Sequence, residues 1–297
     1  MTVRESTGLP VWSARRAFDL IGRTPMSFRI GAAILLVHAI VAIAGPFLVP
    51  YGYAQMGTGA PLSGMSWAHP FGVDQLGRDI FSRVVHGARI VILLSLSGTA
   101  AGLIVGAAVG LFSGYVGGWV DNIIQRLLET LISIPFLVLA LVAMVSFGPQ
   151  LAGHPLVVVF VVALVYAPRI ARMARSAAVD IATRDFVTIA KLRGESSWSV
   201  IRSDILPNAS SVLLVEFALR AGYAPVLIGS LGFLGFGLRP PTPEWGLMIS
   251  ENRALLIIAP ITVLGPGMAL ASLVVGLNLF TEGLARILGR TVKLGGA

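Results

Sequence analysis

Long runs of consecutive apolar residues dominate the pattern of hydrophobic and polar positions along the chain. A membrane-spanning helix needs about 20 mostly apolar residues. The runs that meet this length cover residues 30–49, 90–112, 124–147, 155–174, 212–236 and 257–280. Their apolar residues are consecutive rather than alternating, which disfavours a transmembrane β-barrel. Because backbone polar groups need internal partners in hydrocarbon, each run is predicted to be a helix.

The composition agrees with this pattern. Of the 297 residues, 56% are hydrophobic and only 12% are charged, whereas a soluble domain is about one quarter charged. Too few charges remain to cover a surface that faces water on all sides. The predicted fold class is therefore all-α, a polytopic membrane protein with about six transmembrane helices.

The distribution of basic residues predicts the orientation of the chain. Fifteen lysines and arginines fall in the segments on one side of the predicted spans and four on the other side. The positive-inside rule then places both termini in the cytoplasm. The same rule accounts for the net charge of +8 without nucleic acid. The expected division is a cytoplasmic segment 1–27, a membrane domain 28–290 with an external loop 50–89 and a cytoplasmic loop 175–208, and a tail 291–297. The first run is expected to be an uncleaved anchor, preceded by an interfacial helix at residues 12–21.

Residues that could carry catalysis or bind metal are sparse. The chain has no cysteine, and its four histidines form no spaced metal-binding motif. Lys191 and Lys293 are the only lysines, and neither lies in a phosphate-binding G-x-x-x-x-G-K-[ST] loop. We therefore expect no metal, no cofactor and no enzymatic activity in this chain. Any ATP that drives it must be bound by another polypeptide.

Two features inside the predicted spans invite a functional or a structural interpretation. Glycines recur at every fourth position of the second span, at Gly98, Gly102, Gly106, Gly110 and Gly114. This spacing favours close helix packing over a phosphate cradle. Glu216 and Arg220 are spaced for an ion pair within the fifth span, and Asn278 lies in the sixth. These polar residues belong either to a transport pathway or to helix packing.

The cytoplasmic loop contains an amphipathic segment at residues 186–193, which is predicted to be a surface helix. Gly194 is expected to end it as the C′ residue. The loop resembles the "EAA" loop of ABC importer permeases. The residues that carry the resemblance are Asp185, Phe186, Val187, Thr188, Ile189, Ala190, Lys191, Leu192, Arg193, Gly194, Leu206 and Pro207. Thr188 and Ile189 stand where that family usually has Glu and Ala.

Further segments resemble the dipeptide/oligopeptide/nickel branch of that family, and its second, C-type permease. An external motif runs from His69 to Asp79, and its distinctive residues are Asp74, Leu76, Gly77, Arg78 and Asp79. A second motif covers residues 114–121. A third covers residues 232–246 and includes Gly235, Gly237 and Trp245, which are expected to belong either to the pathway or to helix packing. Ile228 and Glu282 depart from residues that are common in the family.

The resemblance implies a permease subunit that forms half of a pathway for peptides or for a related solute such as a nickel chelate. It also implies a homologous second permease, two cytoplasmic ATPases that bind ATP and Mg, and an external binding protein, in a bacterial or archaeal inner membrane. In the family, the "EAA" loop is a coupling helix that docks on an ATPase. An amphipathic helix lying on lipid headgroups is the alternative for this loop. An ion-coupled secondary transporter and a membrane-embedded enzyme are the alternatives for the whole chain.

Overall fold

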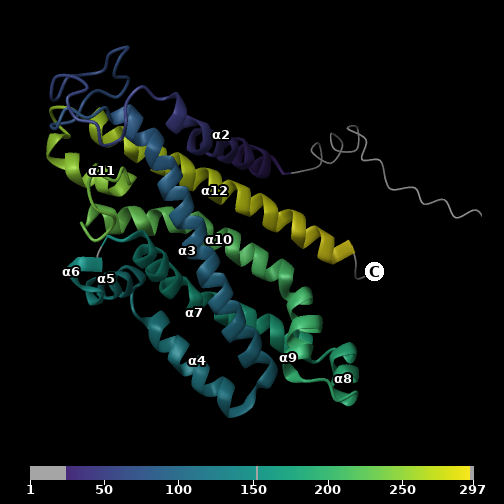
Figure 1. Cartoon of the computed structure of the whole chain (residues 1–297). Coiled ribbons are helices and arrows are strands. Elements are labelled where there is room, and N and C mark those ends of the chain that lie inside the picture. Colours follow the sequence, from purple (N-terminus) through teal and green to yellow (C-terminus); the bar gives the residue numbers. More distant parts are fainter. Residues whose placement is uncertain (1–24, 152, 295–297) are drawn as a thin grey trace, which may run out of the picture.

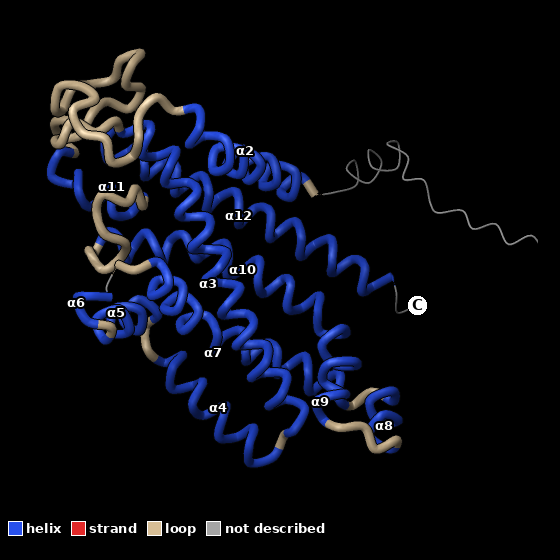
Figure 2. The backbone as a smooth tube through the Cα atoms, viewed as in Figure 1, coloured by secondary structure: helices blue, strands red, loops and turns tan. Residues whose placement is uncertain are grey.

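The computed structural model describes residues 25–151 and 153–294, and its regular elements are helices. Figure 2 shows these helices joined by loops, the longest of which lies at one end of the molecule. The interfacial helix predicted at residues 12–21 lies outside the described residues.

Five long helices form the body of the molecule (Figure 1). They are α2 (Met26–Leu48), α3 (Ile80–Val116), α7 (Pro155–Ala182), α10 (Leu206–Phe233) and α12 (Ile261–Leu294). The shorter elements are α4 (Gly118–Ser133), α5 (Phe136–Ser146), α6 (Gly148–Leu151), α8 (Asp185–Leu192), α9 (Ser197–Val200), a π-helical turn (Ile201–Ile205), α11 (Trp245–Asn252) and a 3-10 turn (Arg253–Leu255). In the described part of the chain, five helices are long and apolar enough to cross a membrane, and the count is six when the bent pair of α4 and α5 is taken as one span. The prediction of about six spans is confirmed.

The third span differs from its prediction. A single helix was expected over residues 124–147, but α4 and α5 meet at an angle of 95°. Pro135 causes the break, because its ring disfavours helical geometry in the preceding residue. Ile134 accordingly has an extended backbone, with φ −74° and ψ 128°. The expectation of one continuous helix here was wrong.

Several helices extend beyond the apolar runs that predicted them. α3 begins at Ile80 rather than at residue 90, because the Asp79 carboxylate caps it by accepting a bond from the Ser82 N–H at 2.7 Å. The helical path into α10 starts at Ser197. Its π-helical turn ends two residues before Pro207, whose ring would clash with a carbonyl of the preceding turn in an ordinary α-helix. α11 lies in a connection for which no helix was predicted.

The glycine face of α3 packs against α7 along its length, as predicted. The five glycines of this face lie nearest to the following α7 residues, in order: Val162, Ala163, Ala167, Ala171 and Arg175. A Cβ atom added to Gly106 would lie 2.6 Å from the carbonyl oxygen of Ala167. This approach is too close for any side chain, so glycine is what allows α3 and α7 to pack at this distance.

The two ends of the molecule are built differently (Figure 1). The first residues of α2, the last of α12 and the segment with α8 and α9 lie toward one end. The loop that follows α2, together with α6 and α11, lies toward the other end. The positive-inside rule makes the first end cytoplasmic and the second external.

Candidate functional site

The helix in the cytoplasmic loop is α8, which begins one residue before its predicted start. Arg193 is its C-cap, and Gly194 follows with φ +76°. The Gly194 N–H donates to the carbonyl of Lys191 at 3.0 Å, and the Glu195 N–H donates to the carbonyl of Ala190 at 3.2 Å. These two bonds define a Schellman motif. The predicted role of Gly194 as the C′ residue is confirmed.

α8 has one face turned toward the protein and another turned away from it. Val187 and Ala190 are fully buried in an apolar cluster with residues of α3, α7, α9 and the start of α10. Phe186, Ile189 and Leu192 point outward, with exposed fractions of 37%, 53% and 82%. The chain therefore holds α8 firmly while leaving an apolar surface uncovered.

The polar residues of this loop lie around that apolar surface. Lys191 places its ammonium group 4.9 Å from the ring centre of Tyr115, which lies near the end of α3. Arg193 forms an ion pair with Glu195 at 2.9 Å. Asp185 and Thr188 are exposed, as are Leu206 and Pro207 at the start of α10.

The predicted motif at residues 114–121 forms the turn between α3 and α4, close to α8. Gly117 and Gly118 both have positive φ values, of 67° and 63°. Asp121 accepts a bond from the Ser113 hydroxyl at 2.6 Å and another from Arg175 Nε of α7 at 2.7 Å. The turn is therefore tied to α7, the same helix against which α8 packs.

At the external end, the motif centred on Asp74 forms a tight loop. The buried Asp74 carboxylate accepts bonds from the N–H groups of Leu76 and Arg78 at 2.8 and 2.9 Å. It also accepts from Arg78 Nε at 2.6 Å and from Arg83 Nη1 at 3.1 Å. Gly77 provides the positive φ that the turn requires, and Leu76 is exposed at its tip.

This loop is joined to α11 by a shared carboxylate. Glu251 accepts bonds from Arg78 Nη2 at 3.2 Å and from Arg83 Nη2 at 2.9 Å. Asp79 accepts a bond from His69 Nδ1 at 2.9 Å in addition to capping α3. Sequence reasoning did not identify Arg83 or Glu251 as partners of the motif, since nothing in their spacing pairs them.

The third motif forms the junction between α10 and α11. Gly235 ends α10 with φ +83°, and a Cβ atom on Gly237 would lie 2.6 Å from the Cα atom of Gly232. Trp245 is buried and donates from Nε1 to the carbonyl of Val84 on α3 at 3.0 Å. Gly235, Gly237 and Trp245 therefore serve turns and packing.

Glu244 caps α11 from a position without solvent exposure. Its carboxylate accepts bonds from the N–H groups of Gly246 and Leu247, both at 2.8 Å. Burial raises the pKa of Glu244 to about 7, and the two N–H donors only partly offset this effect.

A polar cavity of about 240 Å³ lies between α5, α7 and α10. Its lining residues are Phe136, Tyr166, Arg169, Arg220, Tyr223, Val226 and Leu227. Arg220 donates from Nε to the Glu216 carboxylate at 2.7 Å, as the spacing of these two residues predicted. Asn278 lies elsewhere, where its amide donates to the carbonyl of Val274 in its own helix. Arg169 was predicted only as a cytoplasmic flanking charge. Its place within a long apolar run was the signal that could have identified it.

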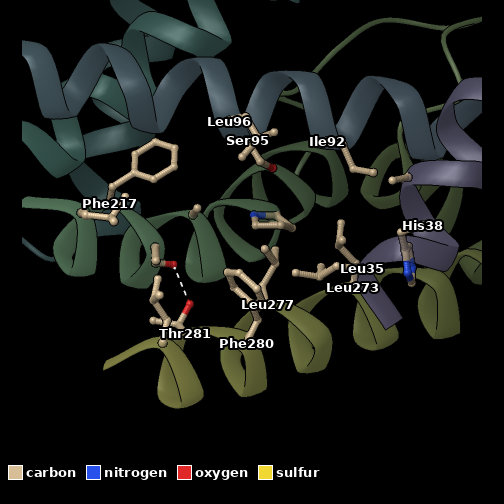
Figure 3. Close-up of a pocket in the computed structure, with 16 residues that line it drawn as sticks. Leu35, His38, Ile92, Ser95, Leu96, Phe217, Leu273, Leu277, Phe280 and Thr281 are labelled. Carbon is tan, nitrogen blue, oxygen red and sulfur yellow. Dashed lines mark hydrogen bonds between the residues drawn. The ribbon is translucent and has the colours of Figure 1, made fainter. Parts of the chain in front are cut away.

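A second cavity, of about 340 Å³, lies between α2, α3, α10 and α12 (Figure 3). Its lining is almost wholly apolar, and the hydroxyl of Thr281 is already bonded to the carbonyl of Ala218 at 3.1 Å. None of its lining residues is Asp, Glu, Lys or Arg. This cavity therefore lacks a carboxylate, lysine or arginine that could pair with a charged solute, in contrast to the cavity that contains Arg169.

The chain is similar to known proteins along most of its length. A family model described as "binding-protein-dependent transport system inner membrane component" matches residues 106–294. The dipeptide transport system permease protein DppC of Alkalihalophilus pseudofirmus is 33% identical, over 97% of this chain and 92% of the relative. The glutathione transport system permease protein GsiD of Salmonella paratyphi A is 37% identical, over 89% of this chain and 86% of the relative. The dipeptide transport system permease protein DppC of Haemophilus influenzae is 34% identical, over 89% of this chain and 90% of the relative.

Proposed function

The chain belongs to the family of binding-protein-dependent transport system inner membrane components, and from that membership we propose that α8 is its docking element for an ATPase subunit. It is a multi-pass inner-membrane permease subunit of an ABC importer rather than an enzyme. Its family works with ATPase and substrate-binding-protein partners.

The uncovered apolar surface of α8 is the observation that carries this proposal. Phe186, Ile189 and Leu192 lie beyond the spanning helices, at the end that the charge distribution makes cytoplasmic. An exposed apolar patch bordered by charged residues is typical of a partner-binding surface. Because Val187 and Ala190 are buried against neighbouring helices, a push on α8 would be transmitted to the helix bundle.

We also propose the composition of the complete importer. A second, homologous permease would cover the exposed side of α10, where Tyr223, Val226 and Phe233 have exposed fractions of 51%, 40% and 40%. Two ATPase subunits would bind ATP and Mg, because this chain has no phosphate-binding lysine motif. The external loop with Leu76 at its tip would face the substrate-binding protein.

The solute that we propose is a peptide. Relatives that cover most of the chain are named as dipeptide and glutathione permeases, and glutathione is itself a peptide. A related small solute such as a nickel chelate is the second candidate, on the resemblance of the external motif. An ion-coupled mechanism is less well supported, because the Glu216 carboxylate is held by Arg220.

The test is to place a charge on the surface of α8. Ile189→Asp should abolish co-purification of the ATPase subunits with the permease, because a carboxylate in an apolar contact loses its hydration without a partner. Leu76→Asp is the matched control, since Leu76 is similarly exposed, at 49%, but lies at the external end. Undiminished ATPase co-purification with Ile189→Asp would contradict the proposal and favour a helix lying on lipid headgroups.

A further inference from the structure

Two arginines lie deep within the spanning helices. Arg169 is fourteen residues from the start of α7, and Arg220 is thirteen residues from the end of α10. At a rise of 1.5 Å per residue, both lie about 20 Å below the external end of the bundle. Charged residues at such depth are costly in lipid, and they usually face a water-filled pathway or a binding site.

The cavity that these arginines line carries excess positive charge. Arg220 is paired with Glu216. Arg169 donates to the carbonyl of Val165 at 3.2 Å, and in the described part of the chain no carboxylate oxygen lies within 4.0 Å of it. The two guanidinium groups also repel each other. An anion is therefore the ligand that would best neutralise the positive charge of this cavity.

The other walls of the cavity suit a small organic anion. Tyr166 is near enough to both arginines to interact with them electrostatically, and Tyr223 lines the same cavity. The hydroxyl groups of both tyrosines can donate hydrogen bonds. Phe136, Val226 and Leu227 add apolar surface. A guanidinium group binds a carboxylate through two parallel N–H donors, which gives both strength and orientation.

A neighbouring cavity lies between this site and the external end. It has a volume of about 330 Å³ and shares Val226 with the arginine cavity. Its other lining residues include Gly229, Ser230 and Phe233 on α10 and Leu234 just after it, and it reaches Gly246 and Ile249 on α11. Two cavities therefore follow one another along α10 between Arg220 and its external end, as they would along the wall of a pathway.

We propose that Arg169 and Arg220, together with Tyr166 and Tyr223, form a carboxylate-binding site inside the translocation pathway. A solute with a free carboxylate would move along α10 and place that group against Arg169. This inference rests on the proposed function, and it adds that the membrane subunit itself selects for a carboxylate.

The test measures binding to the complex of the permeases and their ATPases, without the binding protein, in phosphatidylcholine nanodiscs. The probes are radiolabelled dialanine and two competitors, N-acetyl-dialanine and dialanine amide. The wild-type complex should bind dialanine about tenfold more tightly than the amide, and N-acetyl-dialanine at least as tightly as dialanine. Arg169→Gln should reduce the ratio of the affinities for dialanine and dialanine amide to about one. Arg169→Lys should retain part of this preference.

Arg172→Gln is the matched control, because Arg172 is an exposed arginine of α7 that does not line the cavity. It should retain the wild-type ratio. Equal affinities for dialanine and its amide, no saturable binding of dialanine, or an unchanged ratio in Arg169→Gln would overturn the proposal. Displacement of dialanine by phosphatidylglycerol, relieved by Arg169→Gln, would also overturn it, since the cavity would then hold a lipid headgroup. Uptake of dialanine into proteoliposomes by the full importer, driven by ATP, tests the proposed function separately.

Discussion

At the scale of single residues, Glu244 combines complete burial with a capping role at the start of α11. Its pKa is raised from 4.5 to about 7 by burial. A folded state that holds a proton more tightly than the unfolded state is stabilised at low pH. As the pH rises from 4.5 to 7, the unfolded chain releases its proton first, and the stability of the folded state falls.

Glu244→Gln should remove this dependence, because the amide mimics the protonated carboxyl group. A shift of this size corresponds to about 3 kcal/mol. The variant should therefore gain stability relative to the wild type by about that amount between pH 4.5 and pH 8. Thermal unfolding of the purified proteins across this range provides the measurement, and identical pH profiles for the two proteins would contradict it.

Residue roles could be predicted from the sequence where they depend on nearby residues. Gly194 was identified from its position after an amphipathic segment, and the Glu216–Arg220 pair from its spacing along one helix. The contact of Arg83 with Glu251 joins residues far apart in the chain, and no local pattern encodes it. The place of Arg169 beside Arg220 likewise depends on how α7 packs against α10.

At the scale of elements, the contact between α3 and α7 depends on the absence of side chains from α3. Gly106→Ala should destabilise the protein by about 1–3 kcal/mol, because the added methyl group would meet the Ala167 carbonyl and the Ile170 side chain. Alanine has a higher helix propensity than glycine, so any loss of stability in Gly106→Ala reflects packing. Gly64→Ala is the control, since no atom lies within 4 Å of its added Cβ. The measurement is the thermal stability of the two purified variants. Equal stability of Gly106→Ala and Gly64→Ala would contradict the role of the glycine face in packing.

The external loop is held to α3 and α11 by a network of buried charges. Arg83→Gln removes one of two arginines that neutralise Asp74 and Glu251. Breaking a buried ion pair costs about 3–5 kcal/mol, so amide hydrogen exchange at Thr58 and Val73 should accelerate by roughly 100-fold or more. The exposed Arg253 provides the control variant Arg253→Gln. Exchange that is unchanged in Arg83→Gln would show that the network does not hold the loop.

The sequence predicted the spanning helices well, because twenty apolar residues leave few alternatives to a helix in a membrane. Prediction from the sequence failed where one or two residues break a helix or begin a short one. Pro135 divides the third apolar run into α4 and α5. The capping bonds of Glu244 create α11 in a connection that is too short to be read as a span.

At the scale of the whole molecule, α7 and α10 join the cytoplasmic surface of α8 to the arginine cavity. α8 packs at the cytoplasmic end on the cluster that includes residues of α7 and α10, and the same two helices line the arginine cavity. If an ATPase docks on α8 as we propose, a displacement of α8 would reach the arginine cavity through these helices. We propose that α8 transmits this displacement to the helix bundle.

Gly194 allows the most direct measurement of that claim. A Cβ atom at this position has no neighbour within 4 Å, so only the backbone conformation, at φ +76°, limits the side chain. Valine is strained there by about 1–2 kcal/mol, whereas asparagine tolerates a positive φ. In the purified importer with its binding protein and solute, Gly194→Val should lower stimulated ATP hydrolysis by about tenfold, and Gly194→Asn should retain most of it. Full stimulated hydrolysis by an assembled Gly194→Val complex would contradict the coupling role of α8.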